Sequence, residues 1–253
     1  MLLVFGGTTE GKRCAAALAE AGLPFIYSTK LPVVMPELPG MRLRHGPLTV
    51  EALTALCHAE KVRAIVNASH PFAEVLHATV AAAATALSLP VWRFERVYPK
   101  REQAGEWVRY VPDFPAAIAQ LLALGRAPLL AFTGVQTIPK LRPWWERHLT
   151  YFQILDRPDS FALARSFGVP PAQLLAHAPA TAPETLAATI RRLGVQVLLT
   201  KESGESGFQS VKLAAAALAQ TPLLVVERPA TPTLFSPVHD ETSLLDRVRE
   251  GAR

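Results

Sequence analysis

Short apolar runs alternate with segments of helical periodicity along the whole chain. In the first part of the chain, the apolar runs predict strands near residues 2–5, 24–28, 42–45, 62–66 and 90–94. The segments between them predict helices near 11–21, 49–59 and 72–87. The helix over 72–87 consists almost wholly of Ala, Val, Leu and Thr, so we expect it to be largely buried.

The alternation is interrupted once and then resumes. Residues 98–106 are mostly polar or charged, and we place a domain boundary there, which gives domains 1–98 and 99–253. The second domain is predicted to have strands near 107–111, 128–132, 149–154, 195–199 and 222–226. Its helices are predicted near 113–124, 136–147, 159–166, 183–193 and 208–219. The pattern predicts an α/β protein with two Rossmann-like domains, each a parallel sheet flanked by helices, with the active-site cleft between them.

A turn of small residues follows the first apolar run. Gly6, Gly7, Thr8 and Thr9 come directly after it, and a helical pattern begins at Glu10. A strand that ends in glycines and leads into a helix presents backbone N–H groups and the positive end of the helix dipole at one point, which suits a phosphate. We therefore expect a nucleotide to bind at this turn, with a purely structural turn as the alternative.

Two familiar nucleotide motifs fit this turn only in part. Gly6 to Lys12 has the spacing of a P-loop, but Arg13 stands where that motif needs a Mg²⁺-binding Ser or Thr, which disfavours an NTPase. The dinucleotide fingerprint G-x-G-x-x-G fails in detail, because Gly6 and Gly7 are adjacent and the next glycine is Gly11. The expectation of a bound phosphate therefore depends on the strand, turn and helix rather than on a motif.

A polar loop follows the fourth apolar run. Asn67 or Ser69 can cap the next helix, and Pro71 suits its first turn, so capping explains most of this segment. Capping does not explain His70, which is placed at the carboxyl end of a strand to donate to a carboxylate or to titrate near neutral pH. A capping or surface histidine is the alternative.

Two loops of the second domain repeat this arrangement. Lys201, Ser203 and Gly204 follow one apolar run, where the lysine offers a cation and the small residues let a ligand approach the backbone. Thr133 and Gly134 follow another run in the same way. Because open parallel sheets bind ligands beyond the carboxyl ends of their strands, all these loops are candidates for binding.

The end of the second predicted strand bears on the choice of nucleotide. In dinucleotide-binding sheets, an acidic residue there holds the ribose 2′-OH of NADH, whereas a cation accepts the 2′-phosphate of NADPH. Ser28, Thr29 and Lys30 include a cation and no acid, which favours NADPH. An ordinary polar turn is the alternative.

Composition and charge argue against several other classes. Lys and Arg exceed Asp and Glu by 26 to 21, and the excess is scattered rather than gathered into the basic stripe of a nucleic-acid-binding protein. No run of 18 apolar, uncharged residues occurs, so we expect a cytoplasmic protein without a membrane span. Cys14 and Cys57 fit neither a disulfide framework nor a CxxC site, and we expect no bound metal.

Three segments together resemble a known family. They are GGTTEG after the first strand, NASHPFA after the fourth, and LLTKESGESGFQSVKLAAA near the C-terminus, with further landmarks at 132–134 and 154–158. In this order, over the whole chain, they are similar to the precorrin-6A reductase family of corrin biosynthesis, including its cobalt-precorrin-6A branch. The chain differs from that family's frequent pattern at Asn67, where Asp is common, and at Glu202, where Asn is common.

The resemblance implies an oxidoreductase of cobalamin biosynthesis that reduces one double bond of the precorrin-6A macrocycle to give precorrin-6B. Hydride would go to ring carbon C19 and a proton to the adjacent position. The implied cofactor is NADPH, with NADH as the alternative, and the implied assembly is a monomer or a small homo-oligomer. The same reaction on cobalt-precorrin-6A and a non-catalytic nucleotide-binding or sensor protein stay open as alternatives.

The resemblance also assigns residues. The expected cofactor-binding residues are Gly6, Gly7, Thr8, Thr9, Ser28, Lys30, Thr133 and Gly134. The expected substrate-binding residues are Ser69, His70, Lys201, Ser203 and Gly204. His70 and Lys201 are the expected catalytic residues, and Lys212 is a further candidate for binding the substrate's carboxylates. The proton donor stays open between His70, Lys201 and solvent.

Overall fold

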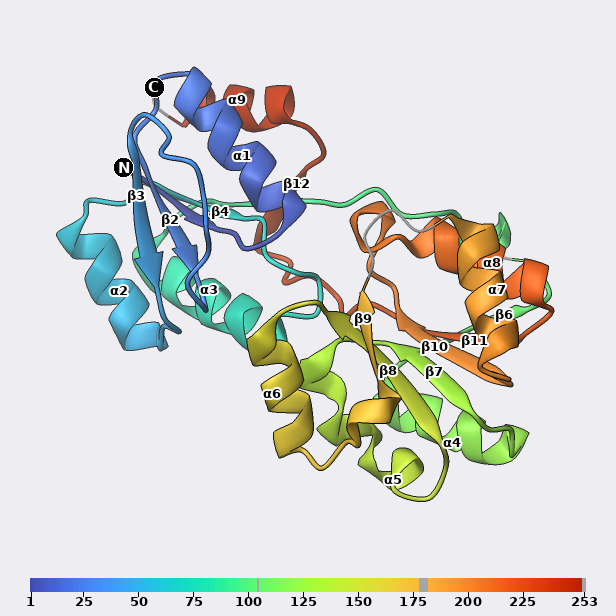
Figure 1. Ribbon diagram of the computed structural model, residues 1–253. Coiled ribbons are helices and arrows are strands. Elements are labelled where there is room, and N and C mark those ends of the chain that lie inside the picture. The colour runs from blue at the N-terminus through green and yellow to red at the C-terminus, as the bar shows by residue number, and fades with distance from the viewer. Residues whose placement is uncertain (104, 178–181, 252–253) are drawn as a thin grey trace. The chain divides into compact units, whose positions relative to one another are not determined.

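A computed structural model describes residues 1–103, 105–177 and 182–251 of the chain. The chain divides into two units: unit 1 comprises Met1–Val97 with Pro229–Arg253, and unit 2 comprises Tyr98–Arg228 (Figure 1). Residues 229–253, which the sequence pattern assigns to the second domain, therefore belong to unit 1. The reason is strand pairing, because β12 (Phe235–Val238) pairs in parallel with β5 (Val91–Phe94).

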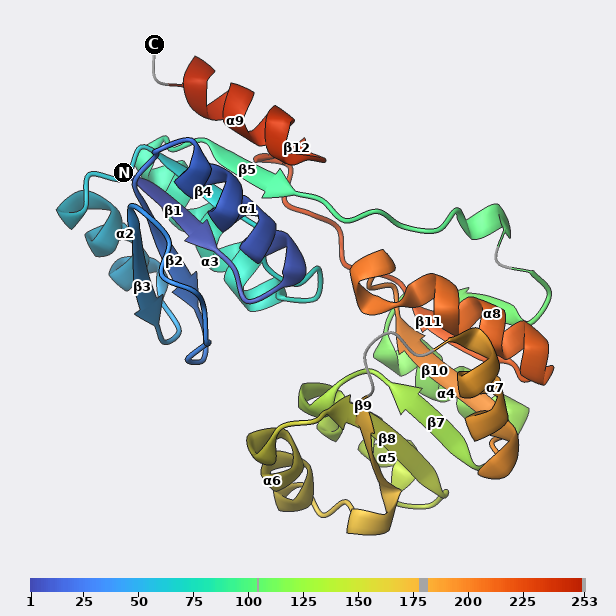
Figure 2. The same ribbon diagram turned by 45° about the horizontal axis from the view of Figure 1, so that its top comes forward.

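Unit 1 is a six-stranded parallel sheet with helices on both faces. The strand order is β12-β5-β4-β1-β2-β3. The strands besides β5 and β12 are β1 (Leu2–Phe5), β2 (Phe25–Thr29), β3 (Met41–His45) and β4 (Ala64–Asn67). The helices are α1 (Thr9–Glu20), α2 (Val50–Ala59), α3 (Glu74–Leu87) and α9 (Glu241–Glu250). Helices α1 and α9 cover one face of the sheet, and α2 and α3 cover the other (Figures 1 and 2).

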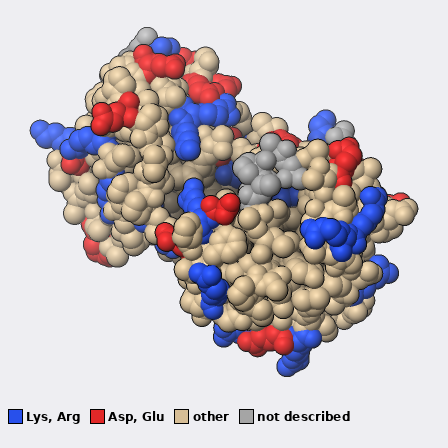
Figure 3. Space-filling model, viewed as in Figure 1, with Lys and Arg blue, Asp and Glu red and all other residues tan. Residues whose placement is uncertain are grey.

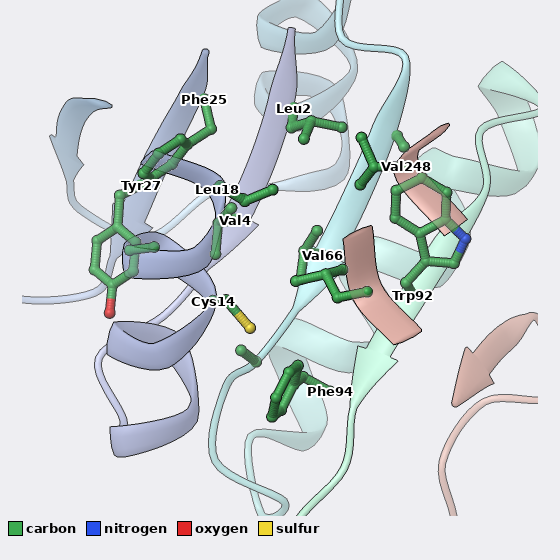
Figure 4. Close-up of a cluster of buried hydrophobic side chains, with 14 of the residues drawn as sticks. Leu2, Val4, Cys14, Leu18, Phe25, Tyr27, Val66, Trp92, Phe94 and Val248 are labelled. Carbon is green, nitrogen blue, oxygen red and sulfur yellow. The ribbon is translucent and has the colours of Figure 1, made fainter. Parts of the chain in front are cut away.

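Burial on both faces explains why β1 is a continuous apolar run. Successive side chains of a strand point to opposite faces. Leu2 and Val4 belong to the cluster formed with α1 and α9, which Figure 4 shows, whereas Leu3 and Phe5 belong to the cluster formed with α2 and α3. Every position of the strand is therefore apolar, as is usual in a parallel sheet with two covered faces.

Helix α3 is less buried than its composition suggests. Its buried residues lie on one face of the helix and are His77, Thr79, Val80, Ala83 and Ala84. Val75 on the exposed side is 83% exposed. The prediction of a largely buried helix was wrong. Ala and Thr are small enough to be tolerated on a solvent-exposed face, so their presence does not distinguish the exposed face from the buried one.

Unit 2 is a second six-stranded parallel sheet, in the order β6-β11-β10-β7-β8-β9. The strands are β6 (Val108–Val111), β7 (Leu129–Phe132), β8 (Thr150–Leu155), β9 (Leu174–His177), β10 (Val197–Lys201) and β11 (Leu223–Val226). The α-helices are α4 (Phe114–Leu124), α5 (Arg142–Trp145), α6 (Pro158–Ser166), α7 (Pro183–Arg192) and α8 (Gln209–Ala219). Short 3₁₀ turns are found at Arg101–Gln103, Val135–Thr137, Pro139–Leu141, Pro171–Gln173 and Glu205–Gly207.

Several elements differ from the sequence-based expectation. The helix predicted over 136–147 is two 3₁₀ turns followed by α5, because Pro139 and Pro143 each lack the N–H that a continuous helix requires. The pattern also missed β9, β12 and α9. Strand β12 contains Pro237, which is tolerated because the strand lies at the edge of its sheet.

Among the described residues, no helix combines the length and the apolar character that a membrane crossing requires. On the face of the molecule shown in Figure 3, Lys and Arg side chains are interspersed with Asp and Glu side chains.

Candidate functional site

The strand order of unit 1 reverses between β1 and β4. From β1 the sheet continues through β2 to β3 on one side, and from β4 through β5 to β12 on the other. Open α/β sheets bind their ligands at such a switch point, beyond the carboxyl ends of the strands. The glycine turn follows β1 and the His70 loop follows β4, so the structure places both at this point. Ser28 and Lys30 are one strand away, at the end of β2.

Tyr27 explains the two glycines of the turn. A Cβ added at Gly6 would lie 2.1 Å from Cζ of Tyr27, so no larger residue fits there. The Gly7 N–H donates to the Tyr27 hydroxyl at 3.0 Å, and Gly7 has a φ of +85°, a conformation that favours glycine. The buried tyrosine thus fixes the path of the turn and takes up one of its N–H groups.

Thr8 caps helix α1 and ties the turn to the β4 loop. Its Oγ1 accepts from the Gly11 N–H at 3.0 Å and donates to the Ala68 carbonyl at 2.6 Å. The backbone N–H groups of Thr8 and Thr9 have no acceptor among the described residues. They lie at the positive end of a 12-residue helix, which is a favourable position for an anion.

A buried ion pair lies beside this turn. Glu10, in the first turn of α1, is bonded to Arg96 at 3.0 Å, and the two side chains are 3% and 5% exposed. Arg96 follows β5, so it comes from the far side of the switch point. Its charge offsets that of the carboxylate, which would otherwise oppose binding of a phosphate nearby.

The β4 loop is held by a buried network. The Asn67 amide oxygen accepts from the Ser69 N–H, the Ser69 hydroxyl and Nη1 of Arg93, at 3.2, 2.7 and 2.9 Å. Arg93 also donates to the Ser69 carbonyl at 2.8 Å. The Ser69 hydroxyl donates to Asn67, so its oxygen accepts from Nε2 of His77 at 3.1 Å. Burial, together with the charge of Arg93, lowers the pKa of His77 to about 4, so His77 is neutral at pH 7.

His70 is half-buried and sits directly after this network. Its Nδ1 accepts from the Phe72 N–H at 3.1 Å. A neutral imidazole that accepts through one nitrogen carries its proton on the other. In this arrangement the proton of a neutral His70 ring lies on Nε2, which can donate a hydrogen bond to an acceptor such as a carboxylate. The role of His70 as a proton source stays a prediction.

At the end of β2, Ser28 is buried and Lys30 is exposed. The Ser28 hydroxyl accepts from Nη1 of Arg44 at 3.2 Å. This arginine belongs to β3, and the sequence pattern gave it no role.

Unit 2 has a switch point of its own. From β7 the sheet continues through β8 to β9, and from β10 through β11 to β6. Thr133 and Gly134 follow β7, whereas Ser203 and Gly204 follow Lys201 at the end of β10, so all five flank this point. The expected site residues thus form two groups, one in each unit.

The loop after β10 is built around helix α8. The Gly204 N–H donates to the Gln209 amide oxygen at 2.9 Å, and Gly204 has a φ of +68°. Lys212 of α8 donates from Nζ to the Gly207 carbonyl at 2.7 Å and lies over the Phe132 ring. Burial, and to a lesser degree the charge of Lys201, lower the pKa of Lys212 to about 8. Two lysines therefore gather at this edge of the sheet.

Glu202 has a different role from its neighbours. Its carboxylate is 1% exposed and is bonded to Arg101 at 2.9 Å and to Arg228 at 3.0 Å. It also accepts from the Arg228 N–H at 3.1 Å. Burial alone would raise the pKa of Glu202, but the hydrogen bond from Arg101 and the contacts with Arg228 hold it below its usual value. Glu202 therefore joins the first residues of unit 2 to the last, and its charge is balanced there.

Comparison with known proteins assigns the chain to a family. The sequence profile of the precorrin-6x reductase CbiJ/CobK family matches residues 1–249. The chain belongs to the precorrin-6x reductase family. Among the relatives, precorrin-6A reductase of Rhodococcus erythropolis is 31% identical over 253 residues, covering 94% of this chain and 93% of the relative. Precorrin-6A reductase of Rhodobacter capsulatus is 30% identical, covering 91% and 89%. Cobalt-precorrin-6A reductase of Priestia megaterium is 28% identical, covering 90% and 91%.

A solved structure in the precorrin-6x reductase family shares the fold. CobK precorrin-6A reductase aligns with a TM-score of 0.78 and 22% identity, over 99% of this chain and 96% of that one. The prediction of an α/β protein with two Rossmann-like halves is thereby confirmed, as is the resemblance to this reductase family.

Reductases of the precorrin-6x family imply a nicotinamide cofactor, and unit 1 fits one. The switch point, the unengaged N–H groups of Thr8 and Thr9, and the glycine at the positive-φ position suit a pyrophosphate. Sequence reasoning found this turn but missed Tyr27, Arg93 and Arg96, which hold it and the β4 loop in place. Nothing in the local pattern marks them, because their partners are distant in the sequence.

Proposed function

We propose that the chain reduces one double bond of precorrin-6A with NADPH and releases precorrin-6B. The observation that supports this proposal is the switch point of unit 1, where a turn suited to an anion and the His70 loop lie side by side in a member of a reductase family. A binding protein without turnover would need the turn but has no use for a positioned proton donor beside it.

The cofactor is assigned to the carboxyl edge of the unit 1 sheet. The N–H groups of Thr8 and Thr9 would donate to its pyrophosphate, and Gly7 would allow close approach. Ser28 and Lys30 would lie near the adenosine end, where the lysine favours NADPH over NADH. Thr133 and Gly134, at the end of β7, are retained as residues for the same cofactor.

The remaining residues position the substrate and handle the proton. When bound, the cofactor supplies the hydride, and a proton added at the neighbouring carbon completes the reduction. Lys201 and Lys212 supply cations for the carboxylates of the macrocycle, and Ser203 and Gly204 line the same loop. We assign proton donation to His70, which would act as an imidazolium and become a neutral imidazole when it gives up the proton, with Lys201 as the second candidate.

The test is anaerobic absorbance at the nicotinamide band with purified protein, precorrin-6A, and either NADPH or NADH. Oxidation that requires both protein and macrocycle, faster with NADPH, is the expected result. Parallel reactions with cobalt-precorrin-6A decide the metal state of the substrate, because relatives named for either substrate match to a similar degree. Cofactor binding without oxidation in any of the four reactions would refute the enzyme and favour a sensor.

A further inference from the structure

The carboxyl edge of β2 and β3 carries, beside Ser28 and Lys30, polar side chains that the proposed function does not yet use. The parallel register places Ser28 beside Arg44 and Thr29 beside His45. Lys30 follows immediately after β2. Directly after the two strands, the Gly46 N–H donates a hydrogen bond to the Thr29 carbonyl at 3.0 Å. Strands β2 and β3 thus hold these side chains on one rigid edge.

Arg44 is oriented rather than mobile on this edge. Its Nη1 donates to the Gly46 carbonyl at 2.6 Å and to the Ser28 hydroxyl at 3.2 Å, and its Nη2 donates to the Pro47 carbonyl at 3.4 Å. These bonds use three of the five N–H donors of a guanidinium. The side chain is only half-buried, and its other donors have no acceptor among the described residues.

Within the described part of the chain, no carboxylate forms an ion pair with Arg44. Its three acceptors are two carbonyls and a hydroxyl, all neutral. Neither residues 28–31 nor residues 44–47 include an acid. Arg42, two positions earlier on the same strand, is different, because it forms an ion pair with Glu60, the residue directly after α2. Burial lowers the pKa of the Arg44 guanidinium.

We propose that Arg44 is the residue that selects NADPH, by binding the 2′-phosphate of its adenosine ribose together with Ser28 and Lys30. This inference rests on the proposed binding of a nicotinamide dinucleotide by unit 1. The end of β2 is where such folds hold the adenosine ribose, and a planar guanidinium can form two parallel hydrogen bonds to a phosphate. Lys30, exposed and flexible, adds charge, whereas Arg44 supplies the fixed geometry.

The experiment measures equilibrium binding of NADPH and of NADH to the full chain and two variants by titration calorimetry. Arg44→Gln keeps a polar side chain with an N–H donor but removes the charge. Arg42→Gln is the matched control, since it removes a charge from the same strand at a position already paired with Glu60. Arg44→Gln should raise the Kd for NADPH about 10–100-fold, the range for a charge-assisted phosphate contact, and change that for NADH less than about threefold. Arg42→Gln should leave both values nearly unchanged.

Binding of two cofactor fragments, one with and one without the 2′-phosphate, isolates the contribution of that phosphate to affinity. Wild-type protein should bind 2′,5′-ADP more tightly than 5′-AMP, and Arg44→Gln should abolish that difference while Arg44→Lys keeps part of it. Equal weakening of NADPH and NADH by Arg44→Gln would show a structural role and overturn the inference, and so would an unchanged NADPH affinity. Wild-type protein that binds NADPH and NADH equally well would overturn the inference alone, whereas binding of neither would overturn the proposed function as well.

Discussion

Replacement of Glu202 by glutamine tests whether one buried carboxylate holds unit 2 together. The variant keeps the size of the side chain and one carbonyl acceptor, but it removes the charge that Arg101 and Arg228 face at 2.9 and 3.0 Å. Breaking a buried ion pair by removal of one partner costs about 3–5 kcal/mol when the other partner stays buried. Here the arginine side chains are 43% and 38% exposed and can regain water, so we expect a smaller loss of about 2–3 kcal/mol.

The assay is urea unfolding combined with native-state hydrogen exchange of the β10 and β11 amides. Exchange is needed because two units can unfold in separate transitions, and these strands report on unit 2 alone. The matched control is Glu227→Gln, since the Glu227 carboxylate is 34% exposed and, among the described residues, forms one ion pair, with Arg101 at 3.2 Å. Glu227→Gln should lower the free energy of unfolding by less than about 1 kcal/mol.

The dependence on pH gives the prediction a second readout. The folded-state pKa of Glu202 lies below its ordinary value of 4.5, so the stabilisation is present above that pH and is lost as the pH falls through the folded value. The difference between wild type and Glu202→Gln should therefore shrink below about pH 4.5. The reasoning would be refuted if Glu202→Gln lowered the free energy of unfolding at pH 7 no more than Glu227→Gln does. It would also be refuted if the effect of Glu202→Gln stayed the same in acid.

Three further substitutions probe the two switch points. Arg96→Leu should cost about 3–5 kcal/mol in urea unfolding because it removes the ion pair with the buried Glu10 carboxylate, and additional replacement of Glu10 by Gln should recover much of this stability; no recovery would contradict the pairing. Gly6→Ala should destabilise by about 1–3 kcal/mol and weaken NADPH binding through the clash with Tyr27, whereas unchanged thermal stability would show that the turn can shift. Lys201→Ala should lower kcat/KM for the macrocycle at least about tenfold with a stability change within about 0.5 kcal/mol, and unaltered turnover would remove this lysine from the site.

Much of the fold could be predicted from the sequence, because a strand that is buried on both faces of its sheet is a continuous run of apolar residues. The continuous apolar runs of β1, β4, β7 and β10 could each be placed within a few residues, and the small or polar residues after them led directly to the loops at the switch points. Two of the edge strands, β9 and β12, could not be placed in this way. Strand β12 is stabilised by pairing with β5, which is about 140 residues earlier, and its own sequence, Phe-Ser-Pro-Val, has no strand pattern.

The candidate site was predictable where its chemistry is local. Gly7 and Thr8 follow a strand and precede a helix, and this order alone suggests a phosphate. The residues that hold the loops were not predictable, because an arginine in a sequence such as VWRFER resembles an ordinary surface residue until its partners are known. Arg93 is 1% exposed and bonds to Asn67, 26 positions earlier, so only the folded sheet reveals its role.

The return of residues 229–253 to unit 1 has a consequence for biosynthesis. During translation, unit 2 has all its residues as soon as residue 228 has emerged, whereas unit 1 must wait for its sixth strand and last helix. At roughly 5–20 residues per second, the ribosome needs on the order of ten seconds to make residues 98–228. For that time, Trp92 and Phe94 on β5 lack the neighbouring strand that completes their cluster in the finished protein. The nascent chain therefore exposes an unpaired, apolar strand edge, and ribosome-associated chaperones are expected to bind it until the final segment arrives.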